Sequence, residues 1–283
     1  MELDFLHQPD SILSSPIAHV LIAGLCFGCC EVFLTQGPPR AWLKKLFKPN
    51  ERLKSRVDQT VQAANARIIG ALHVMVQVPL AIIVMLSPEM RKNRIYSTSA
   101  YSSLMTSISA GYFLFDAFIC MVHFEGLPYL LHGVFCFCAY TYAATSGFLH
   151  YYAAMFLMWE VSTPCVYVRW LLYHIDMHHT KLYVINGMLM LATFFCCRNI
   201  LGTVMSINFF KDSNVELSHQ QRPGDMPHAV IRGYLVVNVI MNGLNAMWFY
   251  KMAKGAVKVL ARGPEGSNSQ KREVTDYEER NNG

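Results

Sequence analysis

Long apolar stretches alternate with short polar segments along most of the chain. Seven stretches stand out: Ile17–Leu34, Ile68–Leu86, Leu104–Phe124, Leu127–Ser146, Leu149–Tyr173, Leu182–Phe210 and Ala229–Met252. About 20 apolar residues, at a rise of 1.5 Å each, cross a hydrocarbon core of roughly 30 Å. The pattern therefore predicts an all-α, polytopic membrane protein with about seven transmembrane helices in one membrane domain, residues 17–260.

Short polar segments predict where these helices turn. Gly126–Pro128 indicates a tight turn between the third and fourth spans, and Thr145–Gly147 indicates another before the fifth, because Gly and Pro favour turns. The polar connection 211–228 precedes the last span. Residues 261–283 are polar and mixed in charge, which predicts a disordered tail.

The composition supports this architecture. Charged residues make up 15% of the chain, against about 25% in ordinary soluble domains, and hydrophobic residues make up 53%. These values argue against a soluble enzyme. The net charge of +5 does not indicate a nucleic-acid partner, because the basic residues lie beside the spans.

The distribution of basic residues predicts an orientation. Residues 1–16 hold no Lys or Arg, whereas the first connection holds Arg40, Lys44, Lys45, Lys48, Arg52, Lys54, Arg56 and Arg67. Under the positive-inside rule this connection is cytoplasmic. Seven spans then place residues 1–16 in the lumen or outside, and the tail 261–283 in the cytoplasm. Arg91, Lys92 and Arg94 in the second connection are the exception.

Apolar residues alternate with lysines in the first connection, at Trp42, Leu43, Leu46 and Phe47. This spacing suits a short amphipathic helix on an anionic membrane surface. A solvated loop is the alternative interpretation.

The cysteines and histidines indicate no metal site. All nine cysteines lie within apolar stretches, where they are small packing residues and not a disulfide framework. His174, His178 and His179 cluster at an interface, but the glutamate of the zinc-protease motif is missing there, so solvation is the stronger interpretation. We expect no bound metal and no cofactor.

Polar residues at membrane depth are the candidates for function, because an ionisable group there is costly. The main ones are Asp116, His132, Glu160, Arg169, Arg198, Asn238, Asn242 and Asn245. Asp116 and His132 fall on adjacent antiparallel spans, and histidine is the natural general base or acyl acceptor near neutral pH. The alternative is a hydrogen-bonded pair that holds two helices together, worth only about 0.6 kcal/mol.

The fifth span carries a helix-breaking motif, Glu160-Val-Ser-Thr-Pro164. Pro164 has no N–H and leaves the carbonyl of Glu160 without its helical partner, which predicts a kink that faces protein or a cavity. Arg169 lies too far along the helix to pair with Glu160. We expect Arg169 to extend to the interface, with Trp170 as an aromatic anchor.

These residues together resemble a known family. Gly111-Tyr-Phe-Leu-Phe-Asp116, His132, Glu160–Pro164 and Arg169-Trp170 resemble the TLC domain, named for TRAM, Lag and CLN proteins. Residues 184–190, 241–248 and 251–259 look like the branch of transmembrane protein 56 (TLC domain-containing protein 4). The resemblance implies a TLC-type helix bundle around a polar cavity, with the TLC domain at about 62–260.

In ceramide synthases of this family, two adjacent histidines transfer an acyl group from acyl-CoA to a sphingoid base. The resemblance places His132 at the first histidine and Gly133 at the second. This departure puts ceramide synthesis in doubt. A partner for His132 would have to come from elsewhere, and His123, Asp116 and Glu160 are the candidates.

The resemblance leads us to expect a protein that binds, senses or redistributes lipid and contributes to membrane lipid homeostasis, in the endoplasmic reticulum or another endomembrane. Membrane lipids are the expected partners, and the sequence names no protein partner. One alternative is an acyltransferase with His132 as catalytic residue and acyl-CoA as co-substrate; another is a trafficking or chaperone-type protein. The residues expected to line the cavity are Asp116, His132, Glu160, Ser162, Pro164, Arg169, Trp170, Asn242 and Asn245.

Overall fold

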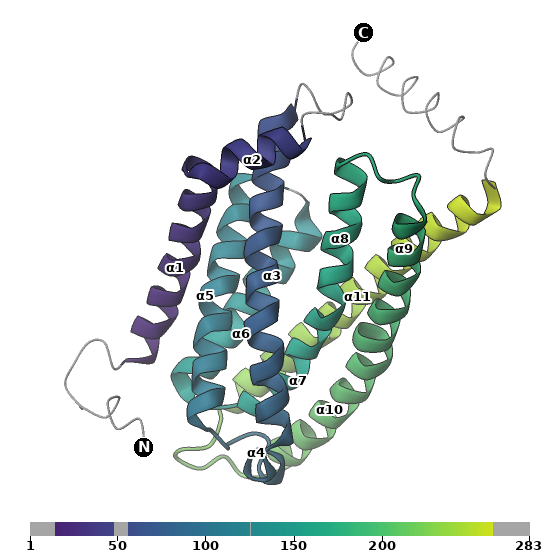
Figure 1. The fold of residues 1–283 in the computed structure, drawn as a ribbon. Helices are drawn as coiled ribbons and strands as arrows, with labels where there is room; N and C mark the ends of the chain where they lie inside the picture. The colour runs from purple at the N-terminus through teal and green to yellow at the C-terminus, as the bar shows by residue number, and fades with distance from the viewer. Residues whose placement is uncertain (1–14, 48–55, 125, 263–283) are drawn as a thin grey trace.

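The computed structural model describes residues 15–47, 56–124 and 126–262, and this part of the chain is helical with no strand. Six helices are long and apolar enough to cross a membrane (Figure 1). They are α1 (Pro16–Gln36), α3 (Val57–Leu86), α5 (Ala100–Val122), α6 (Leu127–Ser146), the continuous segment Lys181–Ser218 and α11 (His228–Arg262). The prediction of a polytopic helical membrane protein is confirmed.

The fifth predicted span is an interrupted helix. It consists of α7 (His150–Leu157), a 3-10 helix, η4 (Met158–Ser162), and α8 (Thr163–His174), which follow one another through the bundle (Figure 1). Pro164 lies in the first turn of α8, where its missing N–H costs nothing. The predicted break at this proline is confirmed, and it places Glu160 in the 3-10 turn.

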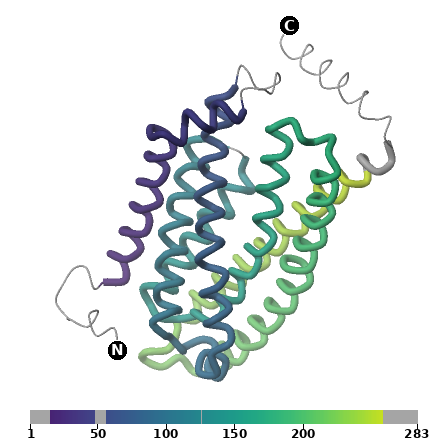
Figure 2. Tube along the Cα trace, viewed as in Figure 1, coloured from purple at the N-terminus to yellow at the C-terminus, as the bar shows by residue number. Residues whose placement is uncertain are grey.

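The sixth span also departs from a regular helix. It is built from α9 (Lys181–Phe194), a π-helix, η5 (Phe195–Leu201), and α10 (Gly202–Ser218). A π-helix is rare and often marks a functional site. The first residues of α1 and the last described residues of α11 lie at opposite ends of the bundle (Figure 2). This placement agrees with an odd number of membrane crossings.

Both predicted glycine turns are present, and one predicted loop is too long. Gly126 and Gly147 adopt φ values of 129° and 76°, which favour glycine, and they join α5 to α6 and α6 to α7.

The predicted polar connection 211–228 is wrong over its first half, because α10 continues to Ser218. Asp212 and Glu216 on this last part of α10 bind Arg94 and Tyr96, which explains why polar residues remain helical there.

Small residues let α1 approach α5 closely. A Cβ atom on Gly111 would lie 2.5 Å from the Cβ of Ala23 and 2.6 Å from the nitrogen of Gly24. Such contacts drive helix packing in membranes, where burial of apolar surface provides little force. Val20 is the buried residue of α1, so this helix lies at the edge of the bundle.

The amphipathic helix of the first connection is α2 (Pro38–Phe47). Leu43 and Phe47 are buried against Val61 and Ala64 of α3, so the apolar face of α2 contacts protein. On its polar face, Arg40 and Lys44 approach Asp58 to 3.0 Å and 2.7 Å. The helical interpretation is therefore confirmed. The lipid-surface interpretation does not hold for its buried face, because that face packs on α3.

The second connection carries basic residues that run against the positive-inside pattern, and two of them, Arg91 and Arg94, bind other parts of the protein. The short helix α4 (Pro88–Lys92) follows α3. Arg91 Nε donates to the Met85 carbonyl at 2.7 Å, and Arg94 Nη1 lies 3.3 Å from Asp212 Oδ2. The ion pair with Asp212 offsets one positive charge of this connection. Residues 1–14 of the predicted terminal segment 1–16, residues 263–283 of the predicted tail 261–283 and residues 48–55 of the first connection lie outside the described residues.

Candidate intramembrane site

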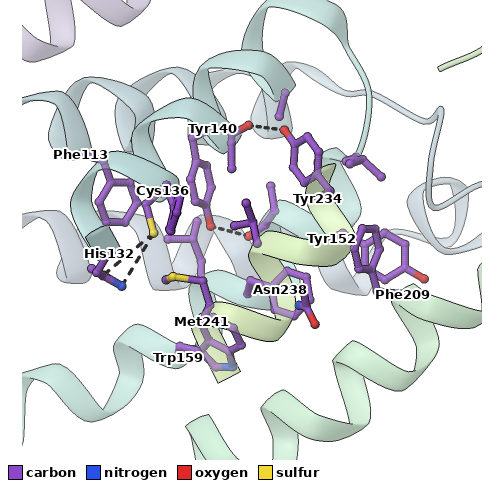
Figure 3. Close-up of a pocket in the computed structure, with 18 of the residues that line it drawn as sticks. Phe113, His132, Cys136, Tyr140, Tyr152, Trp159, Phe209, Tyr234, Asn238 and Met241 are labelled. Carbon is purple, nitrogen blue, oxygen red and sulfur yellow. Dashed lines mark hydrogen bonds between the residues drawn. The ribbon is translucent and has the colours of Figure 1, made fainter. Parts of the chain in front are cut away.

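A cavity lies among α5, α6, α7, η4, α10 and α11 (Figure 3). Its wall is mainly aromatic and aliphatic. It is lined by Phe113, His132, Phe135, Cys136, Ala139, Tyr140, Ala143, Leu149, Tyr152, Ala153, Phe156, Leu157, Trp159, Glu160, Phe209, Tyr234, Val237, Asn238 and Met241. The interruption of the fifth span at η4 brings Glu160 to this wall.

Two tyrosines strengthen the apolar character of the wall. Tyr140 donates from its hydroxyl to the Ala153 carbonyl at 2.8 Å, and Tyr234 donates to the Ala139 carbonyl at 2.6 Å (Figure 3). Backbone oxygens therefore satisfy both hydroxyl donors, and the rings remain to line the cavity. An apolar wall of this kind matches a hydrocarbon chain better than a charged solute.

His132 lies at the cavity wall among aromatic side chains. Its ring is 5.9 Å from the ring of Phe113 and 5.7 Å from that of Trp248, both edge to face. Its ring nitrogens lie 4.0 Å from Cys136 Sγ, one helical turn away (Figure 3). Glu160 lines the same cavity, so the structure brings together His132 and one of its three candidate partners.

The centre of the polar interior is Arg198, whose side chain is 7% exposed. Its Nη2 lies 3.2 Å from Glu160 Oε1 and donates to Thr163 Oγ1 at 2.9 Å, while its Nε donates to Ser162 Oγ at 3.0 Å. Its Nη1 donates to Asn245 Oδ1 at 3.2 Å. A buried guanidinium needs a counter-ion and hydrogen-bond acceptors, and this network supplies both.

The two irregular helices create this network. Glu160 and Ser162 project from the 3-10 helix η4, and Arg198 projects from the π-helix η5. Gly202 allows close contact between these segments, since a Cβ atom there would lie 2.4 Å from Trp159 Nε1. Sequence reasoning identified Glu160, Ser162 and Asn245 but left Arg198 and Thr163 out of the site. The signal for Arg198 was a lone charge within a long apolar stretch.

Other predicted cavity residues lie apart from this network. Arg169 packs over the Tyr183 ring at 4.0 Å and donates to the Tyr183 carbonyl at 3.3 Å. Trp170 is sandwiched by Arg67, at 4.3 Å, and His174, at 4.0 Å between ring centroids. Neither Arg169 nor Trp170 is among the residues that line the cavity. Their predicted role as lipid contacts stays a prediction.

Asn242, Pro164 and Asp116 also lie outside the cavity wall. Asn242 Nδ2 donates to Ser206 Oγ at 2.9 Å, between α11 and α10. Pro164 lies in the first turn of α8, as described above. The Asp116 carboxylate lies beside Gly133 at the contact of α5 with α6.

Little space surrounds Gly133, at the position of the second histidine. A Cβ atom on Gly133 would lie 3.1 Å from Asp116 Oδ2 and 3.2 Å from the Ala117 Cα. A side chain there would need these neighbours to shift by a few tenths of an ångström. His123 does not take the place of the second histidine, because it is exposed at the end of α5 and contacts Gln62.

Comparisons with known proteins agree with this architecture. The profile described as TLC domain matches residues 64–254. The chain is 28% identical over 189 residues to Topoisomerase I damage affected protein 4 of Saccharomyces cerevisiae, which covers 63% of this chain and 64% of that protein. It is 23% identical over 225 residues to TLC domain-containing protein 4-B of Danio rerio, covering 75% and 80% of the two chains.

TLC domain-containing protein 4 of Homo sapiens is 24% identical over 202 residues, covering 70% of this chain and 75% of the human protein. The chain spans less than two thirds of the length of the budding-yeast relative. The resemblance to the TLC domain, and to the branch of TLC domain-containing protein 4, is thus confirmed. The chain belongs to the TLC domain family.

Proposed function

We propose that this protein binds the acyl chain of a membrane lipid in its intramembrane cavity and, by sensing or redistributing that lipid, contributes to lipid homeostasis in an endomembrane such as the endoplasmic reticulum. The observation that carries the proposal is the cavity itself, which is walled by aromatic and aliphatic side chains inside a bundle of helices long and apolar enough to cross a membrane. Ligand sites of this kind combine a mostly apolar wall with a few placed polar groups.

The electrostatics of the cavity favour a lipid whose polar group is uncharged at this site. Arg198 is already paired with Glu160 and bound by three neutral side chains, so it offers little attraction to a further anion. His132, Glu160 and Asn238 are strongly polar side chains on the wall. They are suited to hydrogen-bond a hydroxyl, ester or amide group at the end of the apolar chain.

The test is to fill the cavity and measure the bound lipid. The full chain is purified in lipid nanodiscs, and the retained lipids are quantified by mass spectrometry. Ala139→Phe places a ring into the cavity, whereas Ala246→Phe adds the same ring to an exposed position of α11. We expect a several-fold loss of one lipid class in Ala139→Phe only. Equal lipid content in both variants and the wild type would contradict the proposal.

An acyltransferase is the second candidate, because His132 and Glu160 line the same cavity. Histidine would accept a proton or an acyl group there. Membranes that hold the wild type or His132→Ala are incubated with labelled acyl-CoA and a panel of lysolipids and sphingoid bases. Product made only by the wild type would establish the enzyme. No product from folded protein leaves lipid binding as the function.

A further inference from the structure

A second hollow lies on the outside of the bundle, between α10 and α11. It is lined by Thr203, Ser206, Ile207, Phe210, Lys211, Asn214, Asn238, Val239 and Asn242. The floor is polar and buried, since Ser206 is 8% and Asn238 6% exposed. The rims carry exposed apolar side chains, Ile207 at 49% and Val239 at 60%, and the exposed polar side chains of Thr203, Lys211 and Asn214. We call this hollow the α10–α11 groove.

The polar floor is unusual for its position. Both helices belong to membrane-crossing segments, so the rims face hydrocarbon. A polar group that faces hydrocarbon without a partner costs several kcal/mol, about the value of its lost hydrogen bonds to water. Asn242 Nδ2 donates to Ser206 Oγ at 2.9 Å and to Asn238 Oδ1 at 3.1 Å. These bonds hold the floor together but leave amide groups beside an open groove.

The groove and the cavity share a wall. Asn238 lines both, so the two spaces are separated there by the thickness of one side chain. Asn238, Asn242 and Asn245 are spaced four and three residues apart on α11 and therefore share one face over about 10 Å. Asn245 binds Arg198, and Arg198 binds Glu160 on the cavity wall. Hydrogen-bonding side chains thus continue from the groove to the cavity.

From this continuity we infer that the α10–α11 groove is the lateral entrance through which an acyl lipid passes from the bilayer into the cavity. The inference rests on the proposed lipid-binding function. The apolar side chains of the rims accommodate the acyl chain, and the amides of Asn238 and Asn242 exchange hydrogen bonds with the headgroup as it passes. The occupant is a bilayer lipid with a hydrogen-bonding headgroup, because a slender chain fits both the groove and the cavity behind it.

Two exposed valines of α11 provide a matched test. Val239 lines the groove and Val236 does not, and each is 60% exposed. Val239→Trp narrows the entrance, whereas Val236→Trp adds the same ring elsewhere on the helix surface. The full chain is reconstituted and fused with vesicles made from the lipids of cells fed a diazirine-tagged fatty acid. Samples are irradiated at increasing times, and adducts are quantified at the residues of the α6 peptide, 127–146, that line the cavity, such as Cys136, Tyr140 and Ala143.

We expect the α6 peptide to be labelled several-fold more slowly in Val239→Trp, with Val236→Trp like the wild type. Equal rates in all three proteins overturn the entrance and leave the cavity as a lipid site. No labelling of α6 in the wild type overturns the proposed function and the entrance together. If Val239→Trp dissociates an oligomer of the wild type, the groove is an interface between copies, and the entrance is likewise overturned.

Discussion

At the scale of single residues, Gly133 shows how packing limits chemistry. Its α carbon lies where α5 and α6 meet, with the Asp116 carboxylate and the Ala117 backbone a little more than 3 Å from any added Cβ. The position beside His132 therefore lies in the contact between the two helices, where a larger side chain has little space.

Gly133→Ala should lower stability by about 1–3 kcal/mol, because overpacking displaces a neighbouring helix. Gly133→His should lower it further. The measurement is the thermal unfolding midpoint in detergent. Gly243→Ala on α11 is the control, since nothing lies within 4 Å of its Cβ position. A thermal unfolding midpoint of Gly133→Ala equal to that of the wild type would show that the contact between α5 and α6 accommodates the added methyl group.

Arg198 and Glu160 form a buried ion pair, in which each charge is compensated by the other. Removing one partner leaves the other buried and unpaired, so Arg198→Met and Glu160→Met should each destabilise the protein, the former by about 3–5 kcal/mol. The double variant Arg198→Met/Glu160→Met should recover part of the loss. Unfolding midpoints of the cycle measure the coupling. Additive losses would argue that the two side chains act independently.

Part of this site was predictable from the sequence. Glu160 and Arg198 stand out because charges in apolar stretches are costly. Their pairing was not predictable, because it depends on a π-helix, η5, which places Arg198 opposite η4. No pattern in the sequence predicts that π-helix. Arg169 drew attention for the same reason as Arg198, yet its partner is Tyr183 on the neighbouring helix.

At the scale of elements, α2 is a docked helix and not a loose surface segment. Phe47 is fully buried in a small cluster with Leu43 and α3, whereas Trp42 is 63% exposed. The alternation of apolar residues predicted the helix correctly. It could not tell a lipid surface from a protein surface, because both accept the same apolar face.

Phe47→Ala should cost about 3–5 kcal/mol, as expected for a large buried aromatic side chain. Trp42→Ala should change stability little, because its side chain is mostly exposed. Protease sensitivity of the connection between α2 and α3 is the second readout and should rise only in Phe47→Ala. Equal behaviour of the two variants would mean that α2 is not held by its contact with α3.

At the scale of the whole molecule, α2 and the connection between α10 and α11 lie at opposite ends of the bundle (Figure 1). The basic residues of the first connection lead us to propose that the α2 end faces the cytoplasm. The pairing of Arg94 with Asp212 supports this orientation, because it offsets a charge at the opposite end.

Insertion of an Asn-x-Thr acceptor tests the orientation. An acceptor between residues 220 and 224 should be glycosylated in cells, whereas one between α2 and α3 should remain unmodified. A mass shift on a gel, reversed by a glycosidase, is the measurement. The reverse pattern would invert the molecule in the membrane.

The order of the Arg198 partners along the chain has a consequence for biosynthesis. Glu160, Ser162 and Thr163 leave the ribosome before Arg198 does, so an acidic partner and two hydroxyl acceptors already sit in the bilayer when the guanidinium arrives. An arginine alone at the centre of an inserting helix opposes insertion by about 2.5–3.5 kcal/mol. We therefore expect the fifth span to assist insertion of the sixth.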